Sequence, residues 1–166
     1  SYDSKTTEDL IREARSVGVI SLLSVGVDIA TLPTVVEISE RFPEVFHTVG
    51  VHPHEASTLK DSDLSTLRTA ARHPKCRAIG EIGLDTSCDT PPELQEMVFR
   101  AQIRIAVDLG LPLLIHCRRA FQRTLQILRD EGAHRVGGIM HAFSGSLEMA
   151  REFIRAGFVI SVSGMA

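Results

Sequence analysis

The stretch CRAIGEIGLD, residues 76–85, places an acidic side chain inside an apolar segment. Glu81 lies between Gly80 and Ile82, and a carboxylate in such a position is costly to bury unless it is paired or bound to a metal ion. An arginine partner would satisfy it. A divalent ion would also satisfy it, because one carboxylate can bind an ion or bridge two. Glu81 is therefore the first candidate for chemistry.

Histidines follow other apolar segments in a similar way. His52 comes after the segment 45–51, His116 ends LPLLIH, and His141 ends GIMH. A single histidine at the end of a strand is an ordinary hydrogen-bonding residue. Together with Glu81, these histidines offer nitrogen and oxygen ligands without a competing thiolate, a set that suits zinc, manganese, magnesium or iron. We therefore predict a metal site formed by Glu81, His116 and His141.

Further polar residues near these positions are candidates for substrate contact. Arg118 follows His116 by two residues, where a planar guanidinium can clamp a phosphate or carboxylate, or simply begin a solvated helix. Ser144, in HAFSGS, either helps to hold an anion or caps the next helix. Asp85, in GLD, either orients a ligand, binds substrate or ends a turn. His54, in HPHE, has no assigned role at this point.

These residues lie at the ends of segments in an alternating order of helix and strand. Helical patterns cover about 6–18, 31–42, 61–73, 90–110, 120–131 and 146–156, and apolar strands follow them at 19–25, 45–51, 77–82, 111–117, 136–141 and 158–163. The strands are nearly continuous in apolar residues, as expected for a parallel sheet covered by helices. The sequence predicts six helix-then-strand units.

Two of the helices begin with capping signals. Thr6 precedes Asp9 by three residues, which predicts a cap on the first helix. Thr90 is followed by Pro91 and Glu93, so the sequence predicts a capping box with the proline at the first helical position. Both helices are expected to start at these threonines.

Right-handed crossovers between parallel strands leave two arrangements, an open doubly wound sheet or a TIM-type (β/α)₈ barrel that is incomplete in this chain. Both arrangements gather the loops after the carboxyl ends of the strands at one edge. The metal ligands predicted above would therefore converge there. We expect residues 1–166 to form one partial barrel domain.

The composition sets limits on the class of protein. The chain has 166 residues, a net charge of −3 and 43% hydrophobic residues, so it is globular and carries no broad basic surface. Its cysteines, Cys76, Cys88 and Cys117, match neither a disulfide framework nor a zinc motif. No apolar run approaches the ~18 residues of a membrane span. We expect a cytoplasmic protein without a membrane partner.

Four motifs resemble, in order and spacing, those of the TatD-type metal-dependent deoxyribonucleases, and the likeness extends over essentially the whole chain. They are GVHPHE at 50–55, GEIGLD at 80–85, LGLPLLIHCRRA at 109–120 and HAFSGS at 141–146. The resemblance implies a (β/α)₈ barrel related to the amidohydrolases. It also implies metal-dependent hydrolysis of phosphodiester bonds in DNA.

By the same resemblance, individual residues take roles. Glu81, His116 and His141 would be metal ligands, His52 would be a catalytic residue at the active site, and Arg118 would face the substrate phosphate. The cofactor would be one or two divalent ions, Mg²⁺, Mn²⁺ or Zn²⁺. The substrate would be DNA, single-stranded or with frayed ends.

Two features of the family are not in this sequence, an initial strand with Asp-x-His-x-His and a later Glu-Thr-Asp motif with a ligand aspartate. About six of the eight strands of a barrel are present, and the first and last are missing. We therefore expect this chain to be part of a longer protein and to turn over poorly on its own.

Other functions remain open on sequence grounds. A related metallohydrolase of the same barrel would cleave an ester or amide, and a non-catalytic fragment would only bind metal. Loss of Arg118 distinguishes the first of these, because it should weaken phosphodiester substrates far more than neutral esters. DNA and RNA, and exo- and endonucleolytic cleavage, are equally compatible with the residues.

Overall fold

The structure is a computed structural model that describes residues 5–163. Its centre is one sheet of six strands in the order β1-β2-β3-β4-β5-β6, and all neighbouring strands are parallel. The strands are β1 Leu22–Val25, β2 Val45–Val49, β3 Cys76–Asp85, β4 Leu113–Arg118, β5 Gly138–Met140 and β6 Phe158–Ile160. The predicted α/β class and its parallel strands are confirmed.

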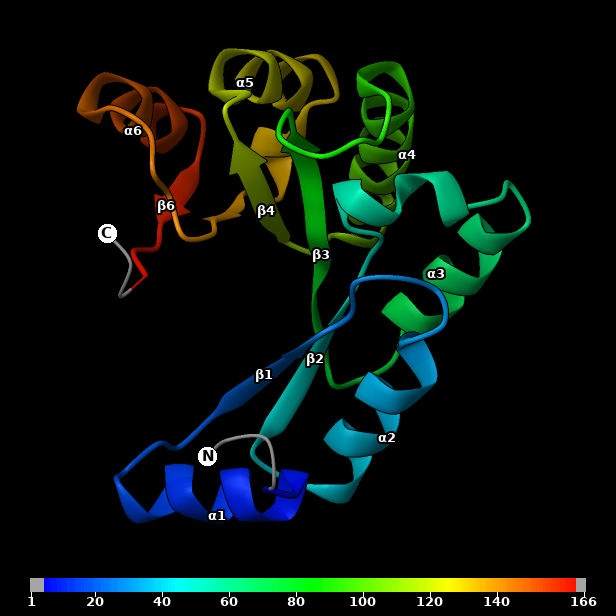
Figure 1. Cartoon of the computed structure of the whole chain (residues 1–166), viewed down its shortest axis with the longest axis vertical. Helices are drawn as coiled ribbons and strands as arrows, with labels where there is room; N and C mark the ends of the chain where they lie inside the picture. The colour runs from blue at the N-terminus through cyan, green and yellow to red at the C-terminus, as the bar shows by residue number, and fades with distance from the viewer. Residues whose placement is uncertain (1–4, 164–166) are drawn as a thin grey trace.

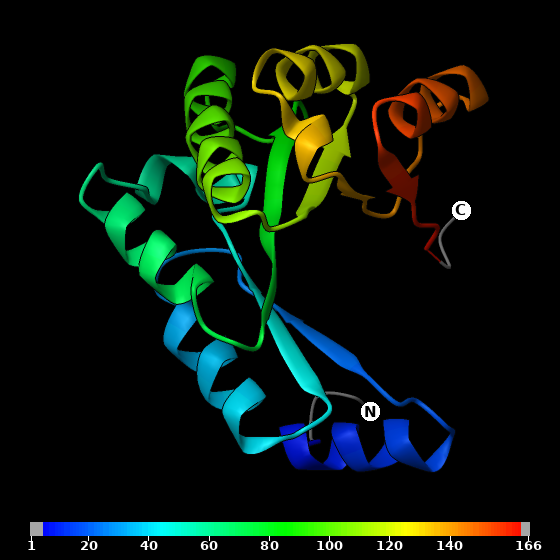
Figure 2. The same cartoon turned by 180° about the vertical axis from the view of Figure 1, so that it is seen from behind.

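Helices precede each strand and cover the outer side of the curved sheet (Figures 1 and 2). The α-helices are α1 Thr7–Ser16, α2 Leu32–Arg41, α3 Asp63–Ala71, α4 Pro92–Leu109, α5 Phe121–Asp130 and α6 Leu147–Arg155. Short 3₁₀ helices cover Pro53–Thr58 and Ala133–Arg135. The six predicted helix-then-strand units are thus all found. No helix within residues 5–163 is long and apolar enough to cross a membrane.

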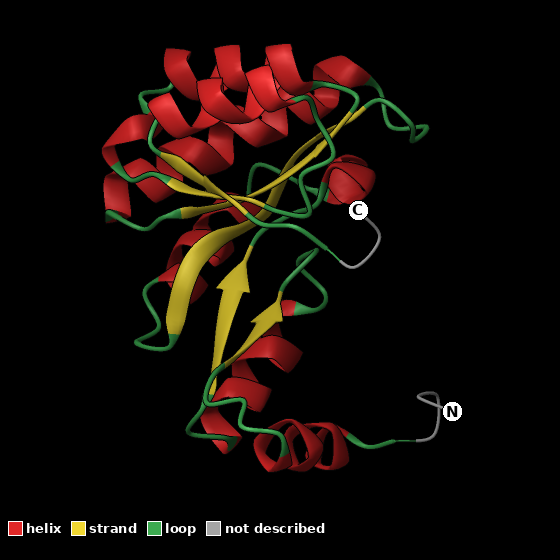
Figure 3. Cartoon of the chain, turned by 90° about the vertical axis from the view of Figure 1, so that its left-hand side faces the viewer, coloured by secondary structure: helices red, strands yellow, loops and turns green. Residues whose placement is uncertain are grey.

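The sheet curves but does not close on itself within the described residues. β1 and β6 each pair with one neighbour there, and Figure 3 shows the sheet opening out between its two outer strands. Apolar side chains at this opening remain exposed, among them Leu23 of β1, Ile139 of β5 and Val159 of β6. The order of the strands is that of consecutive units in a TIM-type barrel.

The main core lies between the sheet and its helices. Phe99 and Ile103 of α4 pack with Ile82 and Ile115 of the central strands, and all four are at most 1% exposed. Cys117 is buried on the same side, where its Sγ lies 3.3 Å from Oγ1 of Thr124. This apolar layer fixes the central strands and, with them, the residues at their carboxyl ends.

One of the two predicted helix caps is confirmed and the other is wrong. Thr6 caps α1 in a capping box with Asp9. α4 instead begins at Pro92 with Pro91 as its N-cap, and no side chain caps it. The hydroxyl of Thr90 donates a hydrogen bond to the carbonyl oxygen of His54 at 3.1 Å, so it serves a long-range contact rather than the helix.

Candidate active site at the carboxyl ends of the strands

His116 of β4 lies between two carboxylates of β3. Its Nδ1 is 3.4 Å from Oε1 of Glu81, and its Nε2 is 2.9 Å from Oδ2 of Asp85. β3 approaches β4 closely enough for this because residue 83 is glycine: a Cβ on Gly83 would lie 1.9 Å from the carbonyl oxygen of His116. The strand pairing therefore brings Glu81 and His116 together, as the sequence predicted.

Two more histidines come from the loop after β2. The ring of His52 lies with its centroid 4.4 Å from that of His116. The ligand atoms of His52, Glu81 and His116 all lie within 4.8 Å of one another. Nε2 of His54 is 2.9 Å from Oδ2 of Asp85. The imidazole of His116 thus belongs to two groups, one with Glu81 and one with Asp85.

Asp85 is the polar centre of the second group. It is 1% exposed, and Oδ2 faces both His54 and His116, while Oδ1 accepts hydrogen bonds from the backbone N–H and the hydroxyl of Ser87. Burial alone would raise the pKa of Asp85, but these hydrogen bonds lower it well below its ordinary value. Since both oxygens are engaged, the geometry favours an orienting role over the predicted substrate contact.

The electrostatic environment keeps the carboxylates charged. Burial would raise the pKa of Glu81, but the hydrogen bond with His116 and the charges of the nearby histidines lower it. Burial would lower the pKa of His116, yet hydrogen bonds to Glu81 and Asp85 raise it. For His52, burial dominates and the neighbouring His116 adds to it, so its pKa falls to about 4. The site thus combines anionic oxygens with imidazoles of different basicity.

The remaining predicted residues surround a cavity of about 560 Å³ beside this group. His116, Arg118, His141 and Ser144 line it together with Phe143. Arg118 and Ser144 are exposed, so both can reach a bound ligand. Ser144 does not cap α6, because Ser146 is the N-cap and accepts a hydrogen bond from the backbone N–H of Met149.

His141 lines the same cavity, but its side chain is farther from the other predicted ligands than a shared metal ion requires. Its backbone N–H donates to the carbonyl oxygen of Ile115 at 2.8 Å, and its Nδ1 is 3.5 Å from Oγ of Ser161. Within residues 5–163, two groups of ligand atoms are close enough to share an ion, and His141 belongs to neither of them. Its role as a ligand stays a prediction.

Two buried glutamines of α4 hold the loops that carry the site, and the sequence analysis missed them. Gln102 accepts a hydrogen bond from the N–H of Val51 at 2.7 Å and donates to its carbonyl oxygen at 3.1 Å. Gln95 makes the same pair of bonds with Asp85, at 2.8 and 3.0 Å. Each amide thereby mimics a neighbouring strand. The sequence signal that could have identified them is a glutamine among the apolar residues on the buried face of a helix.

The side chains present fit a divalent metal ion. Ligand atoms about 2.1 Å from one ion are separated by about 3.0–3.5 Å, and Oε1 of Glu81 and Nδ1 of His116 are 3.4 Å apart. The donors are carboxylate and imidazole, which suit Mn²⁺, Zn²⁺ and, through the carboxylate, Mg²⁺. A carboxylate behind a ligating imidazole is the usual outer partner, and Asp85 occupies that place.

The profile of the family described as "TatD related DNase" matches residues 1–166. The chain belongs to this family. A protein of Bacillus subtilis (strain 168), named "Uncharacterized metal-dependent hydrolase YabD", is 39% identical over 98% of this chain and 64% of its own length. The "3'-5' ssDNA/RNA exonuclease TatD" of Cronobacter turicensis is 36% identical over 95% of this chain and 60% of its own length.

Solved structures of the TatD family share the fold. YJJV, a TATD homolog from Escherichia coli, has a TM-score of 0.86 and 29% identity over 92% of this chain and 60% of its own. A TatD family hydrolase from Entamoeba histolytica has a TM-score of 0.84 at 24% identity, over 92% of this chain and 55% of its own. The chain therefore spans 55–64% of the length of these four relatives.

Proposed function

We propose that this protein hydrolyses phosphodiester bonds in single-stranded nucleic acid, with DNA as its main substrate. One or two divalent ions would bind at the carboxyl ends of the strands. The observation that carries the proposal is the close group of Glu81, His52 and His116 beside a cavity with an exposed arginine. The printed names of the relatives, a metal-dependent hydrolase and a 3'-5' ssDNA/RNA exonuclease, support it.

Glu81, His116 and His141 are the proposed ligands. A divalent ion held by them would supply a Lewis acid for the phosphoryl oxygen and would lower the pKa of a bound water. Asp85 is placed to hold His116 by accepting a hydrogen bond from Nε2–H, so that Nδ1, which faces Glu81, would be the nitrogen that binds an ion. His54 shares the same oxygen of Asp85 and steadies it from the other side.

Arg118 and His52 are the proposed catalytic residues. The guanidinium of Arg118 is exposed on the cavity that His116 and His141 also line, where it can form paired hydrogen bonds with a phosphate and offset its charge. His52 lies against His116, and its proposed role is to accept a proton from water at this site. Ser144, exposed on the same cavity, is a proposed substrate contact.

Replacing Glu81 with Gln tests the proposal. The variant removes the anionic ligand but keeps its size, so Mg²⁺- or Mn²⁺-dependent cleavage of single-stranded DNA should fall by at least about 100-fold. Glu37→Gln, on the exposed face of α2, is the matched control and should cleave as the wild type does. Undiminished cleavage by Glu81→Gln would show that the assignment is wrong.

Arg118→Gln then separates the phosphodiesterase from an esterase of the same fold. If the substrate is a phosphodiester, the variant should lose cleavage of DNA far more than cleavage of a small neutral ester. Equal loss on both substrates would contradict the assignment of Arg118 to phosphate.

A further inference from the structure

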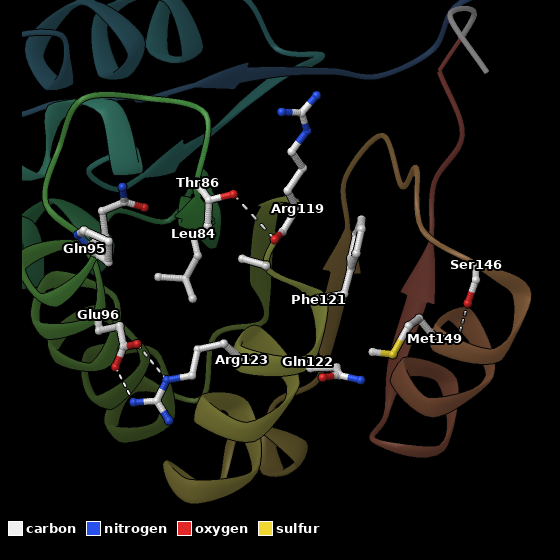
Figure 4. Close-up of a pocket in the computed structure, with 12 residues that line it drawn as sticks. Leu84, Thr86, Gln95, Glu96, Arg119, Phe121, Gln122, Arg123, Ser146 and Met149 are labelled. Atoms are coloured by element: carbon white, nitrogen blue, oxygen red, sulfur yellow. Dashed lines mark hydrogen bonds and ion pairs between the residues drawn. The ribbon is translucent and has the colours of Figure 1, made fainter.

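A second hollow of about 570 Å³ lies outside the candidate active site, between α4, α5 and the start of α6 (Figure 4). We name it the outer groove. Its lining includes Leu84, Thr86, Arg119, Phe121, Gln122 and Met149. The volume is in the usual range for a small-molecule site. None of these side chains takes part in the mechanism above.

The outer groove shares a wall with the active-site cavity. Phe121 lines the groove, Phe143 lines the cavity, and their rings meet edge to face with centroids 5.2 Å apart. Two consecutive arginines also lie on different sides of this wall: Arg118 lines the active-site cavity and Arg119 lines the outer groove. Arg119 has a φ of 55°, a left-handed conformation that turns the chain between the two.

The lining of the groove combines apolar and charged side chains. Figure 4 shows the ring of Phe121 between Arg119 and Met149, with the guanidinium of Arg119 extended away from α5. The other arginine of the lining, Arg123, is tied to Glu96, with its Nε 2.6 Å from Oε1. No carboxylate within residues 5–163 is paired with Arg119. Arg119 is therefore the arginine of the lining that no carboxylate of the described residues engages, and Phe121 and Met149 supply apolar surface near it.

We propose that the outer groove binds the nucleotide next to the one at the active site, with its base against Phe121 and Met149 and its phosphate at Arg119. This inference rests on the proposed function. A nucleotide matches the groove because it joins a flat apolar ring system to an anion, whereas an apolar peptide has no need of the arginine. Stacking accepts every base, so the contact is independent of sequence. It also requires an unpaired strand, since the base must leave a duplex to enter the groove.

Binding without turnover tests the inference separately from the nuclease activity. Calorimetric titrations in EDTA would compare thymidine monophosphate with oligothymidylates of two to eight nucleotides. The wild type should gain affinity between one nucleotide and two, because the second nucleotide fills the outer groove. Arg119→Asn removes the cation and suits the left-handed backbone, and it should weaken the octamer about fivefold or more. It should also reduce the slope of log K against log salt by about 0.7.

A second variant keeps the test independent of folding. α5 has no acidic residue in its first turn, so Gln122→Glu adds a charge that favours the helix while repelling phosphate. It should stay folded and still weaken the octamer about fivefold. Arg72→Asn, at an exposed arginine after α3, loses the same positive charge as Arg119→Asn but far from the groove. This control should bind the octamer as the wild type does.

Three results would overturn the inference. If both groove variants bind the octamer like the wild type, the groove is not a nucleotide site, although the nuclease proposal still stands when Glu81→Gln abolishes cleavage. If the wild type binds no oligonucleotide of any length, the inference falls together with the nucleic-acid substrate. If sedimentation shows a dimer that Gln122→Glu dissociates, the occupant is a second copy of the chain.

Discussion

Histidines gather at both ends of the sheet, and the two groups have different surroundings. The amino-end pair is His47 of β2 and His73, which lies just before β3, with ring centroids 5.0 Å apart. The carboxyl-end group is His52, His54 and His116, with the carboxylates of Glu81 and Asp85 among the rings. The same residue type therefore occurs in two settings that can be compared within one chain.

At the amino end, His47 is part of the packing, while Nε2 of His73 lies 3.2 Å from Oε1 of the exposed Glu40. His47 is fully buried, its Nδ1 is 2.8 Å from the hydroxyl of Ser39, and its Nε2 has no hydrogen-bond partner. Burial lowers its pKa to about 4, and His73 adds to the effect. Nearby, Nζ of Lys75 donates to carbonyl oxygens at the end of α2, among them that of Phe42 at 2.7 Å. This end holds α2 against the sheet.

At the carboxyl end, each imidazole faces a carboxylate, another imidazole or a cavity. His116 has a carboxylate oxygen at each ring nitrogen, and its exposed fraction of 22% leaves it within reach of the cavity. The comparison teaches that clustering alone does not make histidines ligands. A set of largely buried carboxylates shared among neighbouring rings separates the candidate site from the amino-end pair, in which only His73 meets one exposed carboxylate, that of Glu40, in keeping with the division of labour between the two ends of a barrel.

Gly83→Ala should have the largest effect, because it disrupts the carboxyl end through the backbone. The added Cβ would meet the carbonyl oxygen of His116, so we expect a loss of about 3 kcal/mol or more in the free energy of unfolding, measured with urea. Gly110→Ala, at a positive φ with open space around it, should lose only about 1 kcal/mol. Equal losses in the two variants would contradict the close approach of the strands.

The amino-end pair should make the fold sensitive to acid. His47 has a lowered pKa in the folded chain, so the unfolded chain takes up a proton first as the pH falls below about 6.5. Stability should therefore decrease by up to about 3 kcal/mol between pH 6.5 and pH 4. His47→Gln should remove this part of the slope in urea titrations at several pH values. An unchanged slope would show that His47 does not carry it.

Asp85→Asn should weaken metal binding while keeping the shape of the site. The amide cannot serve both His54 and His116 as the carboxylate does, so the affinity for Mn²⁺ should fall about 10- to 100-fold in calorimetry. Asp108→Asn, an exposed aspartate paired with Arg68, is the matched control. Unaltered affinity in Asp85→Asn would remove the orienting role proposed for this residue.

Lys75→Met should give the smallest effect and confine it to the amino end. Loss of the cation at the end of α2 should reduce the free energy of unfolding by about 1 kcal/mol, with no change in metal affinity. Lys60→Met, in an exposed loop before α3, is the control for a lost surface lysine. A fall in metal affinity would mean that the two ends are coupled.

The sequence could predict the order of the elements and the rim on which the site lies, because both follow from periodic patterns and the geometry of parallel strands. The positions of Glu81 and His116 on neighbouring strands are of this kind, although β3 continues to Asp85, beyond the predicted end at residue 82. The sequence could not predict hydrogen bonds between residues that are far apart along the chain. Thr90 matched a local capping signal, yet its hydroxyl bonds to His54, 36 residues away. Gln102 and His54 were missed for the same reason, since their partners, Val51 and Asp85, come from other elements.

The most direct test of the account is the binding of Mn²⁺, followed by electron paramagnetic resonance of the free ion, in the wild type and two variants. Glu81→Gln should lose at least about 10-fold in affinity, and His47→Gln should bind as the wild type does. That result would place the metal at the carboxyl-end group and leave the amino-end pair as packing. Wild-type affinity in Glu81→Gln, or a loss in His47→Gln, would contradict the distinction between the two ends.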